Sequence, residues 1–184
     1  MKKPALIIGA IVLIVLLYGW MTYNGLVTAN VGVDSQWAQV ETQYQRRFDL
    51  IPNLVESVKG IMKQEQTVFT ALADARTHYA GAATVDAKAK AAGEVESALG
   101  RLLVITENYP QLKSSDTVQT LMSQLEGTEN RVSVERKRYN DTVQSYNLLT
   151  MRFPSSLIAS MFGFKARPYF EAAAGAEKVP AVTF

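Results

Sequence analysis

A long N-terminal span without a charged side chain constrains the fold of this chain more than any other feature. The span runs from Pro4 to Val33, and its first half is almost wholly aliphatic. About 20 consecutive uncharged, mainly apolar residues are enough for a helix to cross a bilayer. Tyr18, Trp20 and Tyr23 follow the aliphatic run, as aromatic residues at a membrane interface do. We therefore expect residues 1–24 to be an N-terminal membrane anchor.

A cleaved signal peptide is the alternative interpretation of the same span. The small residues of "VTA" (Val27–Ala29) resemble a cleavage site, but they lie about a dozen residues beyond the apolar core, which is too far. Lys2 and Lys3 are the only charges near the span, and both precede it. The positive-inside rule then places the N-terminus in the cytoplasm and the rest of the chain outside. The opposite topology stays open, because the flank after the span is neutral rather than acidic.

The composition argues against several classes of function. A net charge of +2, without a basic tract interleaved with aromatic residues, does not favour nucleic-acid binding. The chain has no cysteine, which excludes disulfides, thiolate nucleophiles and zinc–cysteine sites. We interpret His78, the only histidine, as a solvated residue at a helix end. No phosphate-binding loop, catalytic serine motif or paired Glu-x-x-His motif is present, so we expect no enzyme, cofactor or metal site.

Apolar residues at intervals of three and four predict an all-α fold, in which the anchor continues into a long first helix. The expected helices cover about residues 25–79, 85–109, 116–152 and 156–162. A Gly/Ala-rich break near Gly81 and the proline Pro110 separate the first three helices. Such helices with short links form an antiparallel bundle of three to four helices. The bundle is expected over residues 25–171, followed by a flexible C-terminal tail over 172–184.

The segment "QRRFDLIPNLVESVKG" (Gln45–Gly60) places a polar face opposite the apolar face of the first helix. The polar face consists of Arg46, Asp49, Asn53 and Glu56. It is either a solvated surface with local ion pairs or a subunit interface. Pro52 lies inside the same helix and predicts a kink, because it removes one hydrogen bond and clashes with the preceding turn.

Arg47 lies in the middle of the apolar stripe rather than on the polar face. Burial of a guanidinium without a partner has a prohibitive free-energy cost. Arg47 therefore either pairs with a carboxylate or buries only its aliphatic stem and extends its charged end to water. Glu129 and Arg136 lie on or beside the apolar stripe of the third helix. We hypothesise a buried polar layer in which Arg47 pairs with Glu129 or Glu135, beside Arg136. Such layers more often fix helix register than perform catalysis.

The segment "FPSSLIASMFGFKARPYF" (Phe153–Phe170) is apolar and aromatic and carries basic residues at Lys165 and Arg167. It can dock on the bundle, lie on a membrane surface or cover a neighbouring subunit. Phe162 and Phe164 are its candidate interface residues.

Six phrases of the sequence, in a fixed order, carry a family resemblance. They are "RRFDLIPNLVESVKG", "ALADAR", "ENYPQLKSS", "LEGTENRVSVERKRYNDTVQSYN", "FPSSLIASMFGF" and "RPYFE". From about Gly25 to Glu171 the chain resembles the LemA family of bacterial membrane proteins. The resemblance implies a transmembrane helix followed by a helical bundle, but no reaction, cofactor or catalytic residue. It also implies a short extracellular N-terminus with the remainder inside, opposite to the orientation that Lys2 and Lys3 predict. Phe48 stands where the family commonly has histidine, which argues against essential chemistry there.

These features together predict a single-pass scaffold protein of the bacterial cytoplasmic (inner) membrane. We expect it to contact the lipid bilayer through residues 4–24 and to act by assembling with itself or with other envelope membrane proteins. The alternative is a monomeric adaptor that presents its bundle to a membrane protease, transporter or signalling partner. An enzyme with an unrecognised site is a third reading.

Overall fold

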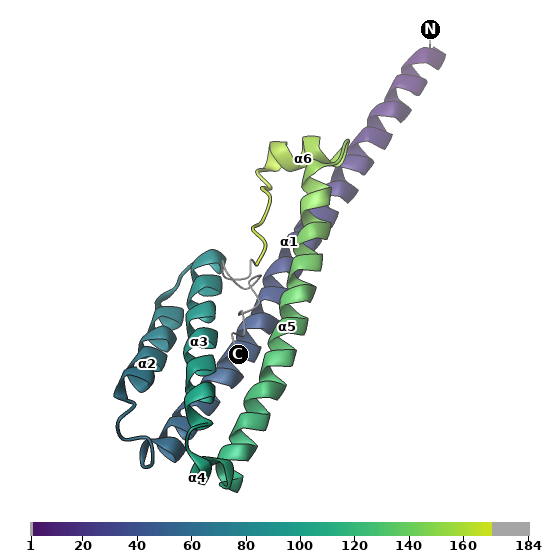
Figure 1. The fold of residues 1–184 in the computed structure, drawn as a ribbon. Coiled ribbons are helices and arrows are strands. Elements are labelled where there is room, and N and C mark those ends of the chain that lie inside the picture. Colours follow the sequence, from purple (N-terminus) through teal and green to yellow (C-terminus); the bar gives the residue numbers. More distant parts are fainter. Residues whose placement is uncertain (1, 171–184) are drawn as a thin grey trace, which may run out of the picture. The chain divides into compact units, whose positions relative to one another are not determined.

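The computed structural model describes residues 2–170, which form six helices (Figure 1). The helices are α1 (Lys2–Lys59), α2 (Gln66–Gly81), α3 (Val85–Thr106), α4 (Pro110–Lys113), α5 (Asp116–Met151) and α6 (Ser155–Phe162). No strand is present in this described range, so the all-α prediction is confirmed. The predicted C-terminal tail over 172–184 lies outside the described residues.

The contacts divide the chain into two compact units. The first, here called the anchor unit, comprises, of the described residues, 2–39 and Lys137–Tyr169. The second, here called the bundle unit, comprises Val40–Arg136 and, of the remaining described residues, Phe170. α1 and α5 each contribute one part to each unit.

The predicted first helix over 25–79 is wrong in one respect, because it is two helices. α1 continues without interruption from the N-terminal apolar span and through Pro52, but it ends at Lys59. Gly60 follows, and glycine is disfavoured in a helix interior. The amides of Ile61 and Met62 both donate to the carbonyl of Val58, at 3.0 and 2.9 Å. The break gives α2 its own direction, so that its apolar stripe packs against α3 (Figure 1).

The break predicted near Gly81 is present, since α2 ends there and α3 begins at Val85. The hydroxyl of Thr84 accepts a hydrogen bond from the amide of Ala87 at 3.1 Å and caps α3. α3 ends at Thr106, three residues before the predicted end at 109. Pro110 does not simply separate two helices but opens the short helix α4, which suits a proline because the first helical amide lacks an intrahelical partner.

The predicted bounds of the last two helices agree with α5 and α6 to within one residue. Gly163 ends α6 with φ of 75°, in the left-handed region that glycine adopts most easily. The amide of Phe164 then donates to the carbonyl of Ala159 at 2.9 Å, which reverses the chain direction.

Each unit has its own core. In the bundle unit the largest fully buried side chains include Tyr44, Leu54, Met62, Leu72 and Leu102. In the anchor unit they include Leu26, Val33, Tyr139 and Tyr146. Full burial of one such apolar side chain contributes about 1.5–3 kcal/mol, so each core stabilises the helix packing of its own unit.

The N-terminal part of α1 has no such cover. Of the described helices, α1 alone is long and apolar enough to cross a membrane, with a mean hydropathy of 2.2 in its most apolar stretch. Its side chains from Leu6 to Leu17 are exposed. This length, composition and exposure support the predicted membrane anchor.

Candidate functional site

Four charged residues of the bundle unit meet in one cluster, here called the charge cluster. Arg47 on α1 forms an ion pair with Glu129 on α5, and its Nη1 lies 4.0 Å from Oε1 of Glu96 on α3. Arg136 on α5 donates from Nη1 to the same Glu96 oxygen at 3.1 Å. Three helices are therefore joined through two carboxylates and two guanidinium groups. Only 7% of Arg47 is exposed, so its charge depends on these partners.

The electrostatics of the charge cluster centre on Glu96. Burial raises the pKa of its carboxyl group above the ordinary value, and the nearby carboxylate of Glu129 raises it further. The guanidinium groups of Arg136 and Arg47 offset part of this shift. Burial thus disfavours the ionised form of Glu96.

Aromatic rings surround the cluster. The ring of Tyr44 lies 5.9 Å from that of Phe48, 5.2 Å from that of Tyr79 and 6.4 Å from that of Phe170. Phe170 also receives the guanidinium of Arg136 at 4.5 Å from its ring centroid. Burial raises the pKa of both Tyr44 and Tyr79, so their phenols stay protonated. Aromatic side chains of α1, α2 and the segment after α6 thus pack beside the charged groups.

Three of the four residues of the hypothesised polar layer belong to the charge cluster. The structure brings Arg47, Glu129 and Arg136 together, and Arg47 pairs with Glu129, one of the two partners considered. Glu135 is half-buried on α5, next to Arg136. Sequence reasoning missed Glu96, although the residue is four positions after Ala92 and three before Leu99 on the apolar stripe of α3. That spacing was the available signal.

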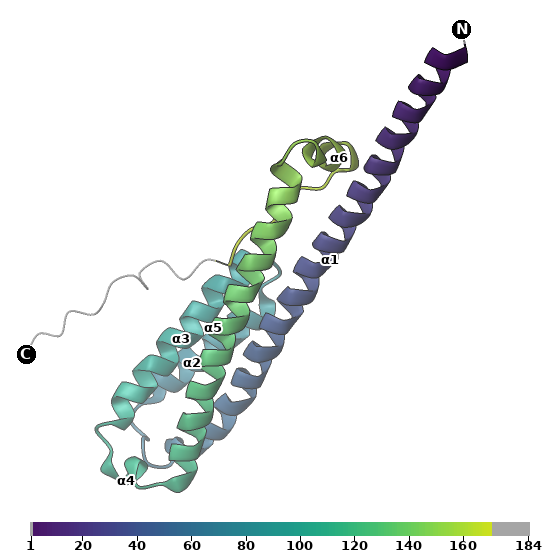
Figure 2. The same cartoon turned by 90° about the vertical axis from the view of Figure 1, so that its right-hand side faces the viewer.

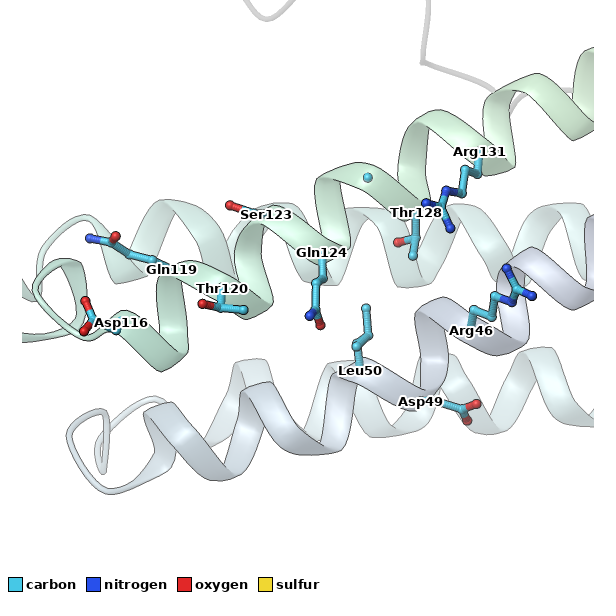
Figure 3. Close-up of a pocket in the computed structure, with 11 residues that line it drawn as sticks. Arg46, Asp49, Leu50, Asp116, Gln119, Thr120, Ser123, Gln124, Thr128 and Arg131 are labelled. Carbon is cyan, nitrogen blue, oxygen red and sulfur yellow. The ribbon is translucent and has the colours of Figure 1, made fainter.

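The four residues of the predicted outer face of α1 are all exposed, but they do not share one environment. Arg46 and Asp49 line an open groove of about 940 Å³ between α1 and α5 (Figure 3). Across the groove, α5 presents mainly hydroxyl and amide side chains, with Arg131 near Arg46 and Asp116 at the far end. We call this the α1–α5 groove.

Glu56 belongs to a second groove, of about 510 Å³, between α1 and α2. Pro52 lines the same groove together with apolar residues such as Phe69 and Leu72. Asn53 lines neither groove, and its backbone carbonyl accepts a hydrogen bond from the Ser57 hydroxyl at 2.7 Å. Arg46, Asp49, Asn53 and Glu56 therefore form a polar ridge on α1. The α1–α5 groove lies on one side of this ridge and the groove between α1 and α2 on the other.

Residues 153–169 of the apolar segment after α5 belong to the anchor unit of the same chain. The rings of Phe162 and Phe164 lie 4.8 and 5.8 Å from the ring of Tyr23 on α1. Farther along, the side chain of Asn147 bonds both backbone groups of Arg167, whose guanidinium forms an ion pair with Asp34. Of the two candidate interface residues, Phe164 is partly covered by this packing, whereas Phe162 keeps 57% of its surface exposed.

His78 is exposed on α2, and its Nδ1 lies 2.8 Å from a carboxylate oxygen of Glu94 on α3. It sits in the last turn of α2, as predicted from the sequence. Among the described residues, no group of three or more histidine, cysteine or acidic side chains is arranged to hold a metal ion.

This combination of an N-terminal apolar helix with an all-helical bundle defines a class of membrane-associated helical proteins. Residues 36–184 match the LemA family, and the chain belongs to that family. Two magnetosome proteins of Paramagnetospirillum magneticum, MamQ 1 and MamQ 2, are each 28% identical over a 177-residue alignment that covers 82% of this chain. MamQ of Magnetospirillum gryphiswaldense is 28% identical over 176 residues. The chain spans about 65% of the length of these curated relatives.

Proposed function

We propose that this protein is a single-pass membrane scaffold that assembles with further copies of itself through the exposed face of α1. The observation that carries the proposal is the polar ridge of α1 with a groove on either side. The ridge supplies charged side chains and the hollows beside it supply space, so a helix of a second copy can pack against this face. The charge cluster fits the same function, because it holds α1, α3 and α5 in one register behind the ridge.

The arrangement of charges on the ridge suits copies that stand in one membrane. Anchored copies pack with their first helices parallel, so a two-fold axis along the membrane normal brings equal heights together. Arg46 and Asp49 are three residues apart, so they are separated by about 4.5 Å along the axis of α1. The long side chain of Arg46 can therefore reach Asp49 of a second copy, and the pairing repeats by symmetry. The α1–α5 groove provides the space for this contact.

The size of the full-length protein in mild detergent tests this proposal. We expect an oligomer at micromolar concentration, weakened by Arg46→Asp or by Asp49→Arg because each creates like charges across the axis. The double swap, Arg46→Asp with Asp49→Arg, restores the complementary pair and should restore the oligomer. Lys90→Glu, at an exposed position on α3, is the control for net charge. A wild-type monomer would contradict the scaffold and favour the monomeric adaptor.

We further propose that the N-terminus is cytoplasmic and that the bundle unit is outside the cytoplasm, as Lys2 and Lys3 favour. The chain has no cysteine, so Gly81→Cys introduces a single thiol at an exposed helix end. We expect an impermeant maleimide to label it in intact cells with a permeabilised outer membrane. Labelling only after the cytoplasmic membrane is disrupted would support the opposite orientation.

A further inference from the structure

α6 and the turn before it expose a cluster of apolar side chains in the anchor unit. Phe153 is 80% exposed, Leu157 58% and Met161 74%. Leu157 and Met161 are four positions apart and so lie on one face of α6. Large apolar side chains concentrated on one short helix indicate a contact surface rather than the scattered exposure usual on soluble domains.

This surface adjoins the end of the aliphatic part of α1. The Cδ1 atom of Ile158 lies 3.8 Å from the place where a Cβ on Gly19 would be, and the Phe162 ring packs on Tyr23. In both views α6 lies across the end of α5, beside α1 (Figures 1 and 2). Its axis is therefore crosswise to α1, as expected for a helix in the plane of a membrane that α1 crosses.

The flanking residues have the character of a bilayer interface. Tyr18 and Trp20 are exposed on α1 on either side of the contact with α6. Arg152 and Lys165 are exposed just before and just after α6. Interfacial helices combine an apolar face with aromatic residues and with basic side chains that contact lipid phosphates.

We infer that α6 is a second membrane contact, which lies in the headgroup region of the bilayer that α1 crosses. In this position Leu157 and Met161 enter the upper acyl chains, and Arg152 and Lys165 contact the phosphates. The occupant of the apolar surface is thus a phospholipid layer, and Gly19 marks the depth at which the bilayer begins. The inference rests on the proposed membrane crossing by α1, but not on self-assembly.

Single cysteines test this inference in the full-length protein, which has no cysteine of its own. Leu157→Cys and Met161→Cys would each carry an environment-sensitive fluorophore in phospholipid vesicles. Lys137→Cys is the matched control, because it is exposed on α5 about 21 Å before Met151 along the helix. We expect a blue-shifted emission at 157 and 161, quenching by a nitroxide on the upper acyl chain, and loss of quenching by iodide. At residue 137 we expect no blue shift, no quenching by the nitroxide and strong quenching by iodide.

Three results would overturn the inference. Iodide quenching at 157 and 161 equal to that at 137 would place α6 in water. Protection from both quenchers would mean that protein, such as a second copy, covers the surface. Extraction of the unlabelled protein from vesicles by alkaline carbonate would show that α1 does not cross the membrane. It would therefore also contradict the proposed anchored scaffold. Retention in the membrane with a water-exposed residue 157 would overturn the α6 inference alone.

The exposed basic residues beside α6, Arg152 and Lys165, allow a second measurement. Vesicles that contain anionic lipid should shift the emission at residue 157 farther to the blue than vesicles of neutral lipid. Arg152→Gln combined with Lys165→Gln should abolish that difference while leaving the emission in neutral vesicles unchanged. An undiminished difference in the double variant would contradict the assigned phosphate contacts.

Discussion

Asn147 on α5 bonds both backbone groups of Arg167: its side-chain nitrogen donates to the Arg167 carbonyl at 2.9 Å, and its oxygen accepts from the Arg167 amide at 2.8 Å. Because Asn147 is only 5% exposed, water does not easily replace these two bonds. The pair holds the extended segment after α6 against α5. Tyr139 adds a third bond, from its hydroxyl to the carbonyl of Pro168 at 3.1 Å.

Asn147→Ala should therefore release the segment after α6. We expect a loss of about 1–3 kcal/mol in the free energy of opening, because both backbone groups of Arg167 lose their partner. Hydrogen exchange of the Arg167 amide measures this directly and should become much faster. Gln144→Ala, at an exposed position on the same helix, should leave the exchange unchanged. Equal exchange in all three proteins would show that the segment is held by other contacts.

The two carboxylates of the charge cluster should respond differently to neutralisation. Glu129→Gln removes the ion-pair partner of the buried Arg47 and should lower the free energy of unfolding by about 1–2 kcal/mol. Glu96→Gln relieves the burial of a charge while it weakens contacts with two arginines, so we expect a change within about 0.5 kcal/mol. Urea unfolding in mild detergent compares them, with the exposed Glu126→Gln as the control. A larger loss for Glu96→Gln than for Glu129→Gln would contradict this order.

The raised pKa of Glu96 also predicts a pH dependence of stability. An acid whose pKa is higher in the folded state binds its proton more tightly there. The resulting stabilisation is fully present below the unfolded pKa, about 4.3, and is lost as the pH rises through the folded value. As the pH rises from about 4, the unfolding temperature of the wild type should therefore decrease relative to that of Glu96→Gln. A parallel pH profile for the two proteins would exclude Glu96 as the source.

Two glycines with different backbone conformations should respond to alanine with opposite signs. Gly163→Ala introduces a side chain at φ of 75° and should destabilise the end of α6 by about 1 kcal/mol. Gly100→Ala lies inside α3, where an added Cβ meets no atom within 4 Å, and should stabilise by about 0.5–1 kcal/mol. Thermal unfolding measures both changes. Stabilisation by both variants would show that the strain at residue 163 is relieved by a local rearrangement.

The parts of the fold that sequence patterns predicted are those set by local chemistry. Pro154 lies just beyond the end of α5 and Gly163 just beyond the end of α6, and both act within one helical turn. The end of α1 at Lys59 was missed, because Gly60 is a single weak breaker in a stretch whose apolar spacing continues on both sides. The packing of α2 against α3, which needs a separate direction for α2, does not appear in the apolar spacing of residues 25–79.

At the candidate site, too, the features set by one helix could be predicted, whereas those set by contacts between helices could not. Arg47 was recognisable as a charge in an apolar stripe, and its partner Glu129 as the matching irregularity on another helix. Glu96 lies on a helix rich in small alanine residues, and its role depends on how closely α3 approaches α1 and α5. Likewise, the polar face of α1 was visible on a helical wheel, but its division between two grooves depends on the neighbouring helices.

The charge cluster contains two positive and two negative side chains, so as a set it is electrically neutral. Loss of Arg47 or of Glu129 alone leaves the other as an unbalanced charge, whereas loss of both together does not. Among descendants of this sequence, Arg47 and Glu129 should therefore change together rather than one at a time. A lineage that replaced all four with apolar residues would keep the fold but would lose the constraint that fixes the rotation of α1 against α3 and α5.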